Sequence, residues 1–582
     1  MCVLRRARRD AKYVRRNTIM ICNCFTKERL VLIICGLVVV YDCIGCRSPQ
    51  DYKVEADEQV YNIIDRKWQD EFGSRANYKI SDTEPSPNDV EIKKNLPADG
   101  VLTLPHAVAL ATANNRQYQL EKELLYTMAL DLRLTRHEFE SRLFSGARVG
   151  YGKEGNDEGV GSEADFGFER MLADGTRIGT RVGIAWFEVL TGNVRGGLAS
   201  ILSATLTKPL LRGSSREVVT ENLTQAEQNT LYQIRSFNRF RKTFVVSVIT
   251  EYYRTLELAD TVENAKQNCH TLDWLCEHVE KLAAVGRVPK EELQRIRQEK
   301  LRATDIHIQA EKNYRQALDD FKFWQLSLPV NTELQLDVNE LEALRSAETA
   351  KTSFSETEAV EAALEQRLDI ANSRDAVIDA ERKVLVAADA LRGELNLFAG
   401  VDATSLSKSS ELAGVGALDD DFVADRNRSN PLRRLRDNQP LRDFRDEAEI
   451  GIDLELPMDR VMEQNIYRKA LITLSQRQRE YEEMVDWATL EVRGAYRDLA
   501  EAMQRYEVQS QALQLAEERL KDTCFLLRYG RASSRRALNA QRNLFQAQNE
   551  AVDALTDYNI ATLNFYCAAG VLAVRPDGMW HH

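Results

Sequence analysis

Between Ala537 and Phe565, small or apolar residues recur at alternating steps of three and four. This heptad pattern is typical of a helix that buries one narrow stripe against a partner helix. The same register occurs 244 residues earlier, between Leu293 and Phe321. Five positions are identical in the two copies: Ala303, Ala310, Tyr314, Ala317 and Phe321 match Ala547, Ala554, Tyr558, Ala561 and Phe565. The chain is therefore predicted to contain two copies of one unit, each with a long coiled-coil helix.

The composition favours extended helices, although 582 residues could hold three or four ordinary domains. Charged residues make up 29% of the chain and are interspersed as on solvated helix faces, and there are only 12 prolines. The net charge is −12, and no helical stretch concentrates basic residues, so nucleic-acid binding is not expected. The chain also lacks a phosphate-binding glycine loop and a GxSxG motif. We therefore expect no enzyme activity and no cofactor.

The N-terminus has the pattern of a targeting segment. A basic stretch precedes a short apolar run at 30–41, which is too short to cross a bilayer as a helix. Cys43-Ile-Gly-Cys46 follows, and a small residue before a cysteine at this place resembles a bacterial lipoprotein cleavage site. We predict a signal segment at 1–45 with Cys46 as the lipidated residue. Asp42 and Cys43 depart from the usual pattern, so a cleaved signal without lipid and an uncleaved anchor stay open.

The other cysteines do not form a disulfide or metal pattern. Cys269, Cys276, Cys524 and Cys567 fall in predicted helices without dense spacing. Cys269 and His270 are separated from Cys276 and His278 by six to nine positions along a rigid helix, which does not bring four ligands onto one metal ion. We interpret them as helix-face residues and predict no metal site.

After an N-terminal extension at 46–99, the first repeat is predicted to span 100–345 and the second 346–574, with a short tail at 575–582. Each repeat is predicted to run helix, two strands, very long helix, Gly-Arg turn, helix. The helix from Ser214 to Val285 alone would be on the order of 100 Å long. The predicted strands lie at 177–187 and 200–207 in the first repeat and at 395–403 and 447–456 in the second, with weaker candidates at 147–151 and 164–169.

The strands alternate apolar residues with polar or small ones. On the strands alone, this alternation favours a half-buried sheet in a soluble domain over a membrane barrel whose apolar face meets lipid. Because the chain carries a secretion signal and no helix is predicted to cover the strands, the barrel is the preferred interpretation. The predicted outward residues are Ile178, Val182, Ile184 and Trp186 in the first repeat and Ile450, Ile452, Leu454 and Leu456 in the second. Four strands cannot close a barrel, so several chains would have to contribute.

In order, spacing and duplication, these features resemble the TolC-like outer-membrane efflux proteins. The resemblance covers Gly100 to about Val574. It is carried by Thr207-Lys-Pro-Leu-Leu-Arg-Gly213, by Val285-Gly-Arg, by Arg528-Tyr-Gly-Arg-Ala-Ser and by the run from Ala537 to Gly570.

The resemblance implies a mostly α fold with a small β part. Three chains would form a homotrimer in which four strands per chain build a twelve-stranded barrel in the outer membrane. The helices would form an antiparallel coiled-coil α-barrel, a tunnel in the periplasm. The implied partners are a periplasmic adaptor (membrane fusion) protein and an inner-membrane transporter, and no nucleic acid.

The resemblance also implies that the two Gly-Arg turns are periplasmic tips that dock the adaptor. The tip residues are Val285, Gly286, Arg287, Tyr529, Gly530, Arg531 and Ser533. Plain turn chemistry, with arginines near helix C-termini, explains the same residues without docking. Some relatives narrow the tip with acidic residues, but Arg536 and Asn539 stand at those places here. An acidic gate is therefore in doubt, although Glu292 would supply a carboxylate.

Two functions remain in view. The chain is predicted to be a passive outer-membrane exit duct of a tripartite efflux or type I secretion system, coupled to an inner-membrane pump. The alternative is a lipid-anchored periplasmic coiled-coil scaffold or adaptor, which would have no need of strands with an outward apolar face.

Overall fold

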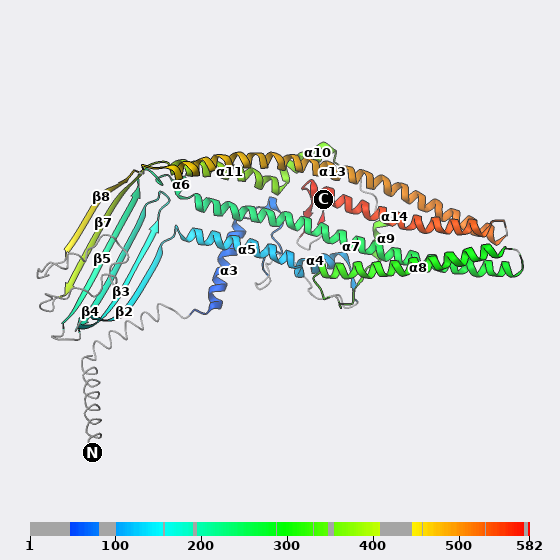
Figure 1. Cartoon of the computed structure of the whole chain (residues 1–582), viewed down its shortest axis with the longest axis horizontal. Helices are drawn as coiled ribbons and strands as arrows, with labels where there is room; N and C mark the ends of the chain where they lie inside the picture. The colour runs from blue at the N-terminus through cyan, green and yellow to red at the C-terminus, as the bar shows by residue number, and fades with distance from the viewer. Residues whose placement is uncertain are drawn as a thin grey trace, which may run out of the picture. The chain divides into compact units, whose positions relative to one another are not determined.

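The computed structural model describes residues 47–80, 100–154, 157–189, 195–286, 288–329, 331–346, 354–407, 445–456, 458–529, 531–575 and 580–581. The chain divides into two compact units, residues 1–60 and 61–582. In the smaller unit the described residues belong mostly to helix α3 (Pro49–Lys67). The larger unit contains the long helices and the sheet (Figure 1).

Two very long helices dominate the larger unit. α7 (Glu221–Ala284) has 64 residues and α13 (Val461–Arg528) has 68, and neither contains a proline. At about 1.5 Å per residue each is on the order of 100 Å long. A short turn joins α7 to α8 (Lys290–Asp320), and another joins α13 to α14 (Ser534–Ala568). α14 packs against both α13 and α7, whereas α8 packs mainly against α7.

The helices that precede the strands are broken, which the sequence analysis did not predict. The first is split into α4 (Leu104–Asn114) and α5 (Arg116–His137), and its counterpart into α10 (Glu356–Gln366) and α11 (Leu368–Asp389). Asn115 and Arg367 occupy the breaks with extended backbone. The Asn115 side chain accepts from the backbone N–H groups of Gln117 and Tyr118 and so caps α5. Periodicity continues through such a break, so it could not reveal it.

Among the described residues, six strands form one antiparallel sheet in the order β2-β3-β4-β5-β7-β8. The prediction of four strands per chain was therefore wrong, although the mostly helical fold with long helix pairs and an antiparallel sheet is confirmed. The weaker candidates at 147–151 and 164–169 form an additional hairpin within this sheet. The strands are β2 (Arg142–Glu154), β3 (Asp157–Met171), β4 (Arg177–Val189), β5 (Arg195–Pro209), β7 (Glu394–Ser407) and β8 (Arg445–Glu455).

Glycines explain why the sequence indicated the first hairpin only weakly. The stretch 152–161 is rich in glycine, and its described residues, 152–154 and 157–161, continue β2 and β3. Glycine there alternates with larger residues, as in Val149-Gly-Tyr-Gly152 and Gly159-Val-Gly161. An alternation between glycine and larger residues is still a period of two, with one face stripped of side chains.

The remaining described elements are short. β1 (Val101–Leu102) pairs in parallel with β6 (Gln335–Leu336), and β9 (Ala573–Val574) pairs with β10 (Trp580–His581). The others are η1 (Asp70–Phe72), α6 (Arg216–Val219), the π-helical turn η2 (Phe321–Gln325) and α9 (Asn339–Ser346). Within the described ranges, every helix is too short or too polar to cross a bilayer.

Candidate functional site: a two-faced sheet and paired helix turns

One face of the sheet is apolar on every strand. Because the strands pair in register, Ile178 lies opposite Leu206, Leu206 opposite Ala399, and Ala399 opposite Ile450. The apolar residues predicted on β4 and β8 therefore lie on the same face of the sheet, joined by apolar residues of β5 and β7. In the single chain these side chains are exposed: Val182 is 47% exposed, Ile184 52%, Ile452 65% and Ile450 77%. The predicted residues Ile178 and Trp186 are half-buried, and Leu454 and Leu456 are exposed.

The opposite face carries charged and small residues. One row runs Arg142, Glu169, Gly179, Thr205, Gly400 and Glu449 from β2 to β8. Arg142 pairs with Glu169 at 3.5 Å. Arg181 of β4 and Asp453 of β8 also lie on this face. The sheet therefore separates an apolar surface from a polar one.

Two phenylalanines cover glycines on the polar face. Phe144 lies opposite Gly167, and Phe398 lies opposite Gly451. A Cβ added to either glycine would come within 2.4 Å of the facing ring. An aromatic ring packed over a strand glycine shields exposed backbone and fixes the register of the pair. The same device thus occurs in the first hairpin and in the last.

The two helix turns lie at the other ends of the long helices. After α7, Gly286 has φ +72° and its N–H donates to the Ala283 carbonyl at 3.0 Å. A left-handed residue of this kind is where glycine is favoured at a helix C-terminus. After α13, the Arg531 N–H donates to the Leu526 carbonyl at 2.9 Å, and Ser533 is the N-cap residue of α14. Arg287 and Gly530, and the proposed lipidation residue Cys46, lie outside the described residues.

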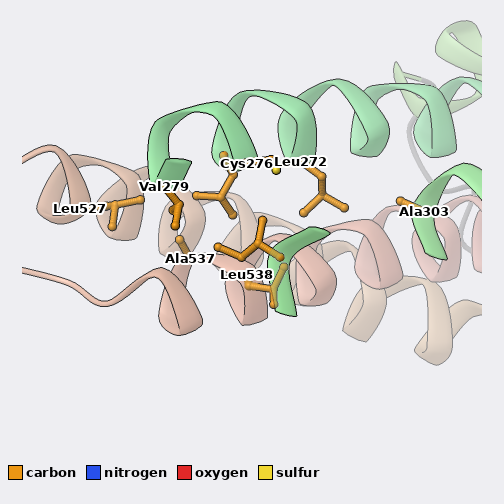
Figure 2. Packing of buried hydrophobic residues seen from close by; sticks show 9 residues of the cluster. Leu272, Cys276, Val279, Ala303, Leu527, Ala537 and Leu538 are labelled. Carbon is orange, nitrogen blue, oxygen red and sulfur yellow. The ribbon is translucent and has the colours of Figure 1, made fainter. Parts of the chain in front are cut away.

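An apolar cluster ties the two turns together (Figure 2). It joins residues from all four long helices, among them Val279 of α7, Ile296 of α8, Leu527 of α13 and Leu538 of α14. Each is at least 96% buried, and burying such a side chain contributes about 1.5–3 kcal/mol. The two helical hairpins therefore form one body at this end.

Cys276 belongs to the same cluster, and burial raises the pKa of its thiol. His278, two residues on, stacks on Trp274 instead, with ring centroids 5.5 Å apart. In the described part of the chain, no three His, Cys, Asp or Glu side chains are grouped so that they could hold a metal ion.

Beyond the cluster, the predicted tip residues are exposed. Val285 is 69% exposed and Tyr529 68%, and Arg531 and Ser533 are exposed as well. Phe525, 60% exposed, packs on Tyr529 with ring centroids 4.9 Å apart, and sequence reasoning missed it. Of the proposed gate residues, Arg536 and Asn539 are exposed and Glu292 is half-buried. The turns thus present an apolar and basic surface.

At each helix break, a polar contact joins the break to the end of the helix that follows the turn in the same repeat. We call these two contacts the polar joints, and sequence reasoning missed both. The Asn115 amide donates to the carbonyls of Trp324 and Gln325 at 2.9 and 3.0 Å. Arg367 donates to the carbonyl of Ala568 at 3.3 Å. Trp324 and Ala568 are 244 residues apart, so the two contacts are equivalent in the repeat. Because asparagine stands at one of these positions and arginine at the other, comparing the two repeats did not reveal the joints.

An ion-pair network links α7, α13 and α14 about midway along α14. Arg505 of α13 contacts Asp553 at 2.5 Å and Asp557 at 2.6 Å. Arg254 of α7 contacts the same two carboxylates and also Glu257. Burial raises the pKa of Glu257 despite the nearby Arg254. The network fixes α14 between its two neighbours.

No protein-family model and no curated protein sequence matches the chain. Solved structures do. The CmeC outer membrane channel of Campylobacter jejuni superposes with a TM-score of 0.54 at 15% identity, over 86% of this chain and 92% of that one. The MtrE outer membrane channel of Neisseria gonorrhoeae gives 0.54 at 14% identity, over 85% and 96%. CusC, solved in a study of transmembrane channel formation, gives 0.55 at 16% identity, over 83% and 96%.

The chain has the fold of the TolC-like outer-membrane channels.

The TolC-like fold accounts for most of the chain, because each match covers more than four fifths of it. The identities of 14–16% explain why no sequence comparison detected the fold. Element order, turns and alternation persist at such distances because they are set by residue class and spacing rather than by residue identity.

Proposed function

We propose that the chain is an outer-membrane channel, the passive exit duct of a tripartite efflux or type I secretion system. The observation that carries this proposal is the exposed apolar face shared by six strands. In water such a face would be covered by another layer. In a bilayer it meets lipid, and the polar face lines water.

The proposed channel is a homotrimer in the outer membrane. The six strands in the described part of the chain fall short of the eight strands of the smallest membrane barrels, so they cannot close a barrel by themselves. Exposed apolar residues on the outer sides of α8 and α13 support contacts between copies, for example Leu301 at 70% and Leu515 at 65%. The TolC-like fold supports three copies.

The turns are proposed to dock a periplasmic adaptor, which would connect the duct to an inner-membrane transporter. Exposed Val285, Phe525, Tyr529 and Arg531 provide the apolar and basic surface for that contact. Cys46 is proposed to carry a lipid anchor. The repeat boundaries, 100–345 and 346–574, stay a prediction.

The test uses one strand and its two faces. Leu202 of β5 lies on the apolar face and is 53% exposed, and Thr205 lies on the polar face. A lysine on a lipid face costs about 2–4 kcal/mol at the bilayer midplane, whereas one facing water costs little. Leu202→Lys should abolish outer-membrane insertion, and Thr205→Lys should leave it intact, as measured by fractionation and planar-bilayer conductance.

Equal tolerance of both lysines, with a soluble periplasmic protein and no conductance for the unmodified chain, would reject the channel. That result would favour the periplasmic scaffold.

A further inference from the structure

The sheet has two edges that are unpaired in the described chain. β2 pairs with β3 and β8 pairs with β7, and the described residues provide no partner for the outer side of either strand. An edge strand presents a row of backbone N–H and C=O groups. In lipid, each such group left unsatisfied costs several kcal/mol. Both edges therefore require a partner strand from beyond the described residues.

The β2–β3 hairpin belongs to the same wall as the other strands. Ala147 lies opposite Ala164, and Ala164 lies opposite Ile184, so the apolar face continues from β4 onto the hairpin. Val149 near one edge is as exposed as Ile450 near the other, at 77% each. A hairpin folded outside the membrane would have no reason to continue this face.

We propose that β2 of one copy pairs with β8 of the next copy, so that all six strands of each chain enter the barrel. With the three copies of the proposed function, on which this inference rests, three times six gives an eighteen-stranded barrel. The twelve strands implied by the resemblance are six too few.

The directions of the edge strands fit this pairing. β2 leads away from the helices and β8 leads back to them, and the two run antiparallel within the sheet. Copies related by rotation about the barrel axis keep that relation, so β2 meets β8 of the neighbour in antiparallel fashion. Their lengths, 13 and 11 residues, also correspond.

The charges on the polar face fit as well. β2 carries Arg142 and Arg148 on that face. β8 carries acidic residues there, namely Glu449, Asp453 and Glu455. Opposite charges across neighbouring strands stabilise the pair, and like charges destabilise it. A copy of β8 is therefore a better neighbour for β2 than a second copy of β2.

The pairing makes the pore wider. Barrel diameter grows about linearly with strand number, so eighteen strands give roughly 1.5 times the diameter of twelve. Barrels of 16–18 strands leave an open aqueous channel.

Disulfide trapping in the full-length protein tests the pairing. Ala147 or Val149 of β2 is replaced by cysteine together with Ile450 or Ile452 of β8, in all four combinations, because neighbouring strands bring Cα atoms within disulfide range. All four positions lie on the apolar face, so the substitutions keep the strand pattern. The matched set places the first cysteine on β4 instead, at Val182 or Ile184.

At least one β2–β8 combination should yield covalent oligomers on a non-reducing gel, and no variant with only one of the substitutions and no β4–β8 combination should. Products from β4–β8 pairs alone, in a protein that still inserts and conducts, would overturn the inference and leave the channel standing. The absence of products from both sets, again with conductance retained, would also overturn it. A protein that neither inserts nor conducts would reject the proposed function itself.

Discussion

The two helices that follow the turns, α8 and α14, carry the same heptad seam, yet the seam is buried to different degrees in the two copies. On α14, seven of the nine seam positions are buried and Leu544 and Ala561 are half-buried. In the first copy only four are buried, and Lys300 is exposed. The difference follows from their neighbours, because α14 lies between α13 and α7 whereas α8 has mainly α7.

A seam that is not covered within one chain indicates where the next chain must lie. Exposed Leu301 and Ile308, at 70% and 60%, extend the apolar surface of α8 outside its contact with α7. In the proposed trimer this surface would pack on the outer side of α13 from a neighbour. The seam of α14 is thus covered within one chain, whereas α8 would need a neighbouring chain to cover its exposed apolar residues.

The two polar joints also differ between the repeats, in the kind of contact that holds them. Asn115 is a small neutral cap, whereas the side chain of Arg367 is fully buried and contacts Glu491 at 2.5 Å and Asp369 at 2.8 Å. Its guanidinium also lies 5.2 Å from the centre of the Trp487 ring. The second joint depends on charge where the first depends on backbone hydrogen bonds.

Removing the joint residues should give the largest effect on stability. Arg367→Met removes the fully buried one of the two arginines that Asp369 and Glu491 share, leaving them only Arg239, and should cost about 3 kcal/mol of unfolding free energy. Asn115→Ala removes a helix cap and should cost about 1 kcal/mol. Thermal and denaturant unfolding of the two variants measures both. Equal costs would show that the joints do not differ as their contacts suggest.

Exchanging residue types at one seam position should give the next largest effect. Leu544→Lys introduces a charge into the seam of α14 and should destabilise the chain by about 1–2 kcal/mol. Lys300, its counterpart, pairs with Asp273 at 2.8 Å on an exposed surface, and Lys300→Leu should change stability by less than about 0.5 kcal/mol. Unfolding curves of both variants provide the comparison. A larger cost for Lys300→Leu would contradict it.

Acid should weaken the second joint and spare the first. Burial raises the pKa of Asp369, but the hydrogen bond from Arg367 and the charge of Arg239 lower it more, so its net pKa lies below the ordinary value. Such a carboxylate contributes stability above the pKa of the unfolded chain, and the contribution is lost as pH falls through the folded pKa. The melting temperature should therefore fall less between pH 5 and pH 3 in Asp369→Asn than in the parent.

The smallest effect on stability is expected at the turn between α13 and α14, where a substitution should impair export instead. Arg531→Glu reverses an exposed charge and should alter stability by less than about 0.5 kcal/mol. If the turn docks an adaptor, this variant should impair export while trimers still form. Arg519→Glu, exposed on α13 away from the turn, is the matched control. Normal export by Arg531→Glu would count against docking and favour plain turn chemistry.

Much of the fold could be predicted because it depends on local pattern. The seam, the proline-free long helices and Gly286 with positive φ were all visible in the sequence. So was the outward face of β8, since a period of two survives in any context. The first hairpin was indicated only by the weaker candidates at 147–151 and 164–169, because glycine on one face concealed the alternation. Asn115 and Arg367 gave no signal, because their roles depend on carbonyls about 200 residues away.

By itself the sequence determined a duplicated chain of long helices with reversing turns and amphipathic strands, since periodicity and turn chemistry act over a few residues. Only the tertiary structure decided that six strands share one continuous apolar face, that both turns rest on one apolar cluster, and that the seam is covered on α14 and open on α8. Those features depend on which segments become neighbours, and register and burial are set by neighbours rather than by any local stretch.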